Sequence, residues 1–166
     1  MSAAAISLHI HPATSGAALA SLPELNLVQD KGIVEDTRYF GRRKEGRPSK
    51  RQVTLIEREV IRQHAAALGV DDFAPGVVRS NIETEGVDLM ALMGRNVQVG
   101  EAVLRFVEPR TPCHQMEALV KGLRALMEDG RQGVIATVVK GGRIRVGDAI
   151  NVLPAEPSDP APRETN

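Results

Sequence analysis

The sequence contains one cysteine and very few aromatic residues. Because Cys113 is the only thiol among 166 residues, the chain cannot form an internal disulfide or a metal site built from cysteines alone. Aromatic residues make up 2% of the chain, so the hydrophobic core must be aliphatic. The shortage of stacking rings and the formal net charge of zero argue against a general nucleic-acid-binding protein.

Several familiar signatures are absent as well. No apolar run approaches the roughly 20 residues that a membrane-spanning helix needs. The N-terminal segment lacks a basic region, and His9, His11 and Pro12 interrupt its apolar residues, so we do not interpret it as a secretory signal. Glycine-rich dinucleotide, Walker A and nucleophile-elbow motifs are missing too. We therefore expect a cytoplasmic protein with a reduced thiol and no membrane or nucleic-acid partner.

What the sequence does contain is typical of one small globular domain. Hydrophobic residues account for 42% of the chain and charged residues for 25%. We expect a single domain over residues 1–153 and a disordered, proline-rich tail over residues 154–166. The balanced charge conceals a basic segment, because residues 38–51 contain seven Lys or Arg and one Glu. That segment carries +6, so the rest of the chain carries −6.

The hydrophobic periodicity predicts a mainly β chain with two or three helices. Alternating apolar residues predict strands over 5–11, 25–28 and 77–84, a hairpin over 97–107 and a final hairpin pair within 134–153. Helical spacing predicts helices over 54–68, 88–93 and 116–127. The first begins with a Thr54–Glu57 capping box, and Gly122 weakens the last, which we expect as one helix or two short ones. Together they predict an α+β fold with a mixed sheet curled into a barrel-like shape.

Cys113 is the first candidate for chemistry. It ends a stiff loop, Pro109-Arg110-Thr111-Pro112-Cys113, and opens a helical pattern. A thiol at the start of a helix meets free backbone N–H groups, which favour the thiolate, and the neighbouring Arg110 and His114 could assist. Such a thiolate can attack sulfur, accept a persulfide or bind a soft metal. A buried structural cysteine is the alternative interpretation.

Basic and amide side chains form the second candidate group. Arg38 and Arg51 flank ordered elements at the ends of the basic segment, and Arg79 and Asn81 alternate with apolar residues on a predicted strand. Guanidinium and amide groups suit an anion or a heterocycle, although a solvated loop and an ordinary solvent face would look the same. The four histidines show no zinc-like spacing, and we expect His64 to be a core or boundary residue.

Taken in order, the segments of this chain resemble the MOSC family. This family is the C-terminal domain of molybdenum cofactor sulfurases and also occurs as stand-alone proteins. The resemblance spans about residues 5–153. The matching segments are Gly32-Ile33 with Asp36 and Arg38, residues 51–57, residues 79–82, residues 86–94, residues 100–104, Thr111-Pro112-Cys113 and residues 141–148.

The resemblance implies a function for the candidate residues. Cys113 would carry sulfur received from a pyridoxal-phosphate-dependent cysteine desulfurase, or would bind molybdenum in a molybdopterin-dependent reductase. Contacts to the molybdenum cofactor would come from Arg38, Arg51, Arg79 and Asn81, with Thr111 lining the loop.

One residue departs from the family pattern. Glu35 stands before Asp36 where the family usually has Gly. Because glycine often marks a position with unusual backbone angles, we expect the ligand loop to differ at this point.

Three functions therefore remain open from the sequence. The first is a sulfur carrier or molybdenum-cofactor-binding protein that acts through Cys113. The second is a molybdenum-dependent reductase of N-hydroxylated compounds, which would need an outside reductant. The third is a non-catalytic binding module that keeps the fold only. The sequence does not indicate an oligomeric state.

Overall fold

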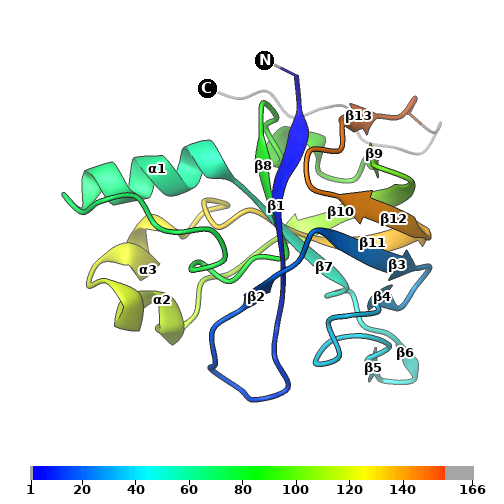
Figure 1. Ribbon diagram of the computed structural model, residues 1–166, viewed down its shortest axis with the longest axis horizontal. Helices are drawn as coiled ribbons and strands as arrows, with labels where there is room; N and C mark the ends of the chain where they lie inside the picture. Colours follow the sequence, from blue (N-terminus) through cyan, green and yellow to red (C-terminus); the bar gives the residue numbers. More distant parts are fainter. Residues whose placement is uncertain (1, 156–166) are drawn as a thin grey trace.

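The computed structural model describes residues 2–155 (Figure 1). It is 15% helical and 36% strand, which confirms the predicted α+β class. No helix in this part of the chain is long and apolar enough to cross a membrane. Most of the predicted tail lies outside the described residues. The elements are β1 (Ala4–Ile10), β2 (Ala20–Ser21), β3 (Glu24–Val28), β4 (Gly32–Ile33), β5 (Arg43–Lys44), β6 (Arg47–Pro48), β7 (Val53–Glu57), α1 (Arg58–Ala67), β8 (Ile82–Glu85), a 3-10 helix (Met90–Leu92), β9 (Asn96–Val99), β10 (Ala102–Pro109), α2 (His114–Leu119), α3 (Leu123–Leu126), β11 (Val134–Lys140), β12 (Gly142–Arg145) and β13 (Ile150–Val152).

An eight-stranded mixed sheet dominates the structure. Its strand order is β13-β9-β10-β11-β7-β8-β1-β2, and only β7 and β8 run parallel among the pairs described. The sheet stays open, because its two edge strands, β13 and β2, do not pair with each other in the described chain. The predicted barrel therefore does not close. The predicted hairpin at 97–107 is confirmed as β9–β10. The predicted final hairpin is wrong, because β12 pairs with β3 and β13 pairs with β9.

The region predicted as a helix over 54–68 is a strand followed by a helix. β7 is a central strand, paired with β11 and β8, and all five of its residues are buried, because Val53 and Leu55 pack into one hydrophobic core and Ile56 into another. A strand buried on both faces is apolar at successive positions, which imitates helical spacing over a short window. Thr54 and Glu57 therefore do not form a capping box. Thr54 instead bonds Asn81, and Glu57 accepts the Leu89 N–H.

Of two other predicted elements, one is shorter than expected and one is divided as the sequence allowed. The strand predicted over 77–84 begins only at Ile82, because the chain still turns at Arg79, whose φ is +66° and whose N–H bonds the Gly76 carbonyl. The helix predicted over 116–127 divides into α2 and α3 at Gly122, whose φ is +94°. This division confirms that Gly122 weakens the helix.

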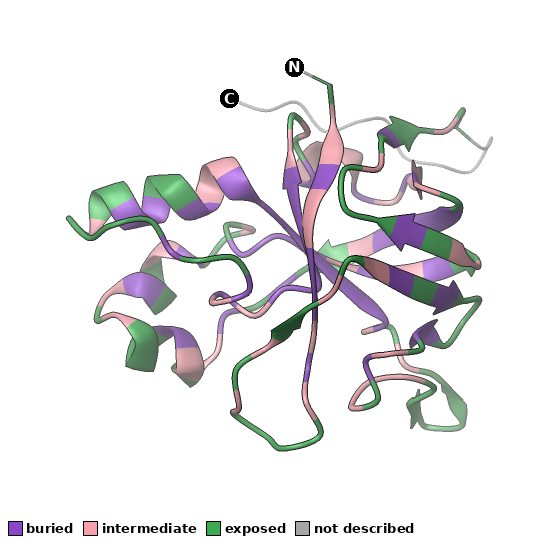
Figure 2. Ribbon diagram, viewed as in Figure 1, coloured by how far each residue is buried: buried purple, intermediate pink, exposed green. Residues whose placement is uncertain are grey.

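Two aliphatic cores hold the elements together (Figure 2). The larger joins the eight-stranded sheet to the β12-β3-β4 sheet, and Phe106 is its one buried aromatic residue within the described chain. The smaller lies beneath the three helices, which gather on one side of the sheet in Figure 1. An aliphatic core was predicted and is confirmed. The smaller core consists of Ile56, Ile61, Ala65, Phe73, Val78, Met116, Leu123 and Met127.

Candidate functional site

One pocket gathers side chains from several separate parts of the chain. We call it the thiol pocket, and its volume is about 170 Å³. Of the six residues predicted for the site, all except Asn81 lie on its lining. The lining residues are His11, Arg38, Tyr39, Arg51, Arg79, Arg110, Thr111, Cys113 and Gln115.

Cys113 supplies the thiol of this pocket. The residue is half-buried and has an extended backbone, with φ −112° and ψ 176°, and α2 starts directly after it. Its Sγ lies 3.7 Å from Gln115 Oε1. The loop before it is tied to the sheet by a hydrogen bond of 3.0 Å from the Arg110 N–H to the Gly133 carbonyl. His114, the other predicted helper of the thiol, is exposed and does not line the pocket.

Four arginines bring uncompensated positive charge to the thiol pocket. They are Arg38, Arg51, Arg79 and Arg110, and none of them forms an ion pair with a carboxylate of residues 2–155. Guanidinium groups that lack carboxylate partners and share one pocket favour an anionic ligand, because such a ligand would supply the missing counter-charge.

Arg110 is the most unusual of the four. Its side chain is buried, and Nη1 donates to Ser80 Oγ at 3.0 Å. Burial, followed by repulsion from Arg51, lowers the pKa of Arg110 to about 9. The guanidinium therefore stays protonated at neutral pH while paying a desolvation cost that no carboxylate within residues 2–155 offsets. An anion bound beside it would remove part of that cost.

Arg79 is held in the pocket by a strained backbone. Its φ of +66° lies in the left-handed region, which side chains other than glycine, asparagine and aspartate rarely adopt. Its Nη1 donates to the Ala17 carbonyl at 2.9 Å, on the loop between β1 and β2. Burial and the charge of Arg38 both lower the pKa of Arg79. Strain of this kind is often found at binding sites.

Tyr39 is a site residue that sequence reasoning missed. Its ring lies beneath three guanidinium groups, with the Arg51 Cζ 4.3 Å from the ring centroid and the Arg38 and Arg42 Cζ atoms each at 5.6 Å. The ring also meets His11 edge-on, with centroids 4.9 Å apart. Cation–π attraction holds the arginines in place despite their mutual repulsion. The position of the only tyrosine directly after Arg38 was the available signal.

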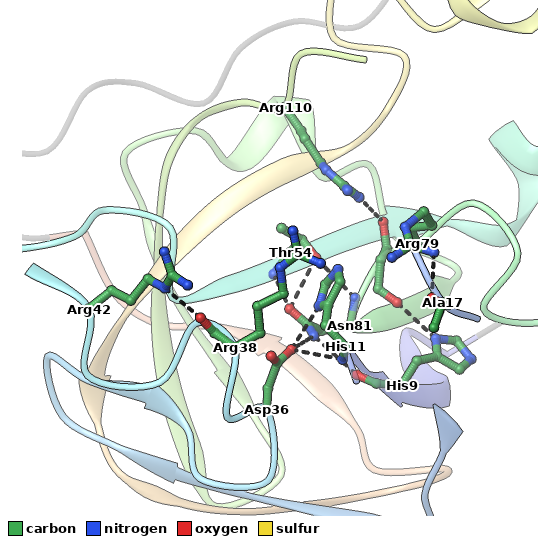
Figure 3. A network of polar contacts seen from close by, with 11 residues as sticks. His9, His11, Ala17, Asp36, Arg38, Arg42, Thr54, Arg79, Asn81 and Arg110 are labelled. Carbon is green, nitrogen blue, oxygen red and sulfur yellow. Dashed lines mark hydrogen bonds and ion pairs between the residues drawn. The ribbon is translucent and has the colours of Figure 1, made fainter. Parts of the chain in front are cut away.

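A buried polar network supports the pocket from behind (Figure 3). Asp36 Oδ2 accepts hydrogen bonds from Asn81 Nδ2 at 2.7 Å and from His11 Nδ1 at 2.9 Å. Asn81 also donates to the His9 carbonyl and accepts from Thr54. Asn81, predicted to contact the cofactor, therefore lies behind the lining and positions Asp36 rather than facing the pocket.

The same network determines the protonation of His11. Burial lowers the pKa of His11, although Asp36 acts in the opposite direction. Burial alone would raise the pKa of Asp36, but its hydrogen bonds, chiefly from His11 and Asn81, outweigh burial and lower it. At neutral pH Asp36 is thus a carboxylate and His11 is neutral, with its proton on Nδ1. The Nε2 atom makes no hydrogen bond with any described residue and is not sealed inside the protein, so it is free to accept one in the pocket.

Glu35 lies in the loop that carries Asp36. It is not among the described residues with a left-handed backbone, so the position makes no demand that only glycine can meet. Its carboxylate accepts hydrogen bonds from Asn26, at 2.6 Å from the side-chain Nδ2 and at 3.0 and 3.1 Å from the backbone N–H. Glu35 therefore ties the loop that carries Asp36 to strand β3.

Comparison with known proteins identifies the family of the chain. The model of the MOSC domain family matches residues 32–151, and the chain belongs to this family. The match includes every residue that lines the thiol pocket except His11. No curated protein matches the sequence.

Solved structures show the same fold. YuaD from Bacillus subtilis has a TM-score of 0.75 and 21% identity, covering 92% of this chain and 96% of its own. YiiM from Escherichia coli has a TM-score of 0.67 and 19% identity, covering 96% and 73%. YiiM from Geobacillus stearothermophilus has a TM-score of 0.66 and 16% identity, covering 92% and 75%.

Proposed function

We propose that the protein binds a molybdenum cofactor in the thiol pocket and that Cys113 is its thiolate ligand. One observation carries this proposal. The only thiol of the chain shares a pocket with four arginines, and one of these, Arg110, is buried without a carboxylate partner in the described chain. A thiolate is a soft ligand that suits molybdenum, and guanidinium groups suit the phosphate of a pterin cofactor.

The residues of the pocket fit such a group. The pocket offers the Cys113 sulfur, four guanidinium groups and the neutral His11 Nε2 atom, which has no partner within residues 2–155. A larger hollow of about 480 Å³ is lined by residues 109–112 and shares Arg110 and Thr111 with the thiol pocket. A ligand larger than the thiol pocket could therefore extend past Thr111.

Each side chain then has a distinct task. When bound, the cofactor would supply two-electron redox chemistry. Cys113 holds the metal, while Arg38, Arg51, Arg79 and Arg110 bind and orient the anionic part of the ligand. His11 keeps its proton on Nδ1, which donates a hydrogen bond to Asp36, and offers Nε2 as a proton acceptor. Reduction of an N-hydroxylated compound on this site would draw its electrons from an outside reductant.

The half-buried thiol also supports a second candidate function, that of a sulfur carrier. In this function the Cys113 thiolate attacks the outer sulfur of a donor persulfide, and the donor leaves as a thiolate. The chain has no second cysteine to resolve the new persulfide, so the sulfur must pass to an outside acceptor or to a bound cofactor. A pyridoxal-phosphate-dependent desulfurase is the proposed donor. This function uses the thiol but leaves the four arginines unexplained, and we therefore rank it second.

Mass spectrometry of the intact protein tests both proposals. Because the chain has one thiol, its fast alkylation by iodoacetamide near neutral pH reports on Cys113. We expect slower alkylation in protein from a host that makes molybdopterin than in protein from a host that does not. A gain of one sulfur atom after incubation with desulfurase and cysteine would instead support the carrier. Equal alkylation from both hosts without any persulfide would contradict both functions and leave the non-catalytic binding module.

A further inference from the structure

A second pocket lies beside the thiol pocket and shares one residue with it. We call it the hairpin pocket; it has a volume of about 560 Å³. The shared residue is Arg51. The lining residues are Lys44, Glu45, Arg47, Pro48, Ser49, Lys50, Arg51 and Glu108.

We propose that the hairpin pocket binds the diphosphate group of an anionic ligand. Four basic side chains line it against two acidic ones, and none of the four forms an ion pair with a carboxylate of residues 2–155. The acidic residues that balance the basic segment lie elsewhere in the chain, since residues 38–51 alone carry +6. The two glutamates of the lining leave an excess of positive charge, which dissolved anions or an anionic ligand must balance.

The hairpin geometry favours a ligand over free solvation. Strands β5 and β6 place Lys44 directly opposite Arg47. Like charges in such a pair destabilise a hairpin, and an anion bound between them would reverse that effect. The turn at Glu45 and Gly46, with φ of 53° and 76°, is the tight type that holds two strands in register. Figure 2 shows the hairpin fully exposed, so a ligand has free access.

The lining also indicates which part of the ligand is recognised. No aromatic side chain lines the hairpin pocket, so there is no ring on which a base could stack. We therefore expect the phosphates to be bound without discrimination between bases. The diphosphate would belong either to a free nucleotide or to the nucleotide end of a ligand whose other end occupies the thiol pocket, since Arg51 reaches both. The proposal does not depend on Cys113, which lies outside the hairpin pocket.

Titration calorimetry of the full chain with inorganic pyrophosphate, at low salt, tests the proposal. We expect two binding sites in the wild type. K44A/K50A should lose the hairpin site, weakening it at least about tenfold. R38A/R79A should lose only the site in the thiol pocket. R143A/R145A removes the same charge from β12, where both arginines lie near Glu24, and should retain both sites. All four changed residues of K44A/K50A and R143A/R145A are exposed, so these variants should fold like the wild type.

Nucleoside diphosphates then distinguish the two sources of the diphosphate. A free nucleotide should be weakened by K44A/K50A alone, equally for adenosine and guanosine diphosphates. A ligand that spans both pockets should bind once per chain and be weakened by both double variants. The proposal is overturned if K44A/K50A binds pyrophosphate and nucleotides as R143A/R145A does. It is also overturned if the wild type has no hairpin site, and neither result bears on molybdenum binding at Cys113.

Discussion

Replacement of Asp36 by asparagine should destabilise the protein by about 3 kcal/mol at neutral pH. Three donors converge on Asp36 Oδ2, namely the His11 N–H at 3.3 Å, His11 Nδ1 at 2.9 Å and Asn81 Nδ2 at 2.7 Å. A hydrogen bond to a charged acceptor is worth about 1 kcal/mol more than one to a neutral acceptor. The asparagine keeps the shape of the side chain but removes its charge, so all three bonds weaken together.

The effect of Asp36→Asn should depend on pH in a defined way. Burial raises the pKa of Asp36, but its hydrogen bonds outweigh burial and lower it below 3.8. A lowered acid pKa gives stability that is complete above the unfolded value and lost as the pH falls through the folded value. Because Asp36 also raises the pKa of His11, the variant loses more stability than the wild type as the pH falls below 6.5. The difference between wild type and variant should therefore not narrow between neutral pH and about pH 5, and it should shrink only below 3.8.

Urea denaturation followed by circular dichroism measures this difference. Asp71→Asn is the matched control, because Asp71 is exposed and the same charge is removed there. We expect the control to change the free energy of unfolding by less than about 0.5 kcal/mol. The reasoning is refuted if Asp36→Asn costs no more than the control, or if its cost does not decline in acid.

Three further predictions concern other residues. Arg110→Met should stabilise the ligand-free protein by about 1 kcal/mol, because it removes a buried charge without a carboxylate partner in the described chain. The same change should weaken pyrophosphate binding in the thiol pocket. Urea denaturation measures the first effect and titration calorimetry the second. Burial lowers the pKa of His64 below 6.5, so its contribution to stability is complete above pH 6.5 and declines in acid. His64→Gln should therefore flatten the pH dependence of the free energy of unfolding between about pH 6.5 and 5. Gly133→Ala places a Cβ 1.9 Å from the Leu55 carbonyl oxygen and should lower the free energy of unfolding by at least about 3 kcal/mol. Gly147→Ala is the control, because Gly147 has a φ of +91° but no atom within 4 Å, and it should lower that free energy by about 1 kcal/mol. Equal losses would show that the backbone beside Leu55 gives way.

The sequence predicted the fold class better than the individual elements. The class and the aliphatic core follow from composition and alternation, which do not depend on how the strands pair. The boundary between β7 and α1 could not be predicted, because a strand buried on both faces and the helix after it form one apolar pattern. The pairing of β12 with β3 could not be predicted either, because the Gly141-Gly142 turn permits a hairpin but does not require one.

Five residues that line the thiol pocket were predicted from the sequence. Arg38, Arg51, Arg79, Thr111 and Cys113 were found through their motif segments, and the fold brings all five to one pocket.

Other members of the site escaped sequence reasoning. Tyr39 and His11 were not predicted as site residues, because only the long-range contact between the end of β1 and the loop after β4 brings them together. Arg110 was noticed as a neighbour of the thiol, but its burial without a carboxylate partner within residues 2–155 is a property of the folded chain. Asn81 shows the converse, since its amide serves the network rather than the pocket.

The central claim is that Cys113 holds a molybdenum cofactor in a pocket of arginines. Its most direct test is the molybdenum and pterin content per chain of protein purified from a host that makes molybdopterin. Cys113→Ser removes the sulfur, and His114→Ala is the control, because His114 is adjacent but exposed and outside the pocket. We predict that the wild type and His114→Ala carry molybdenum and that Cys113→Ser has lost it. A wild type without molybdenum, or a Cys113→Ser protein with as much molybdenum as the wild type, would contradict the claim.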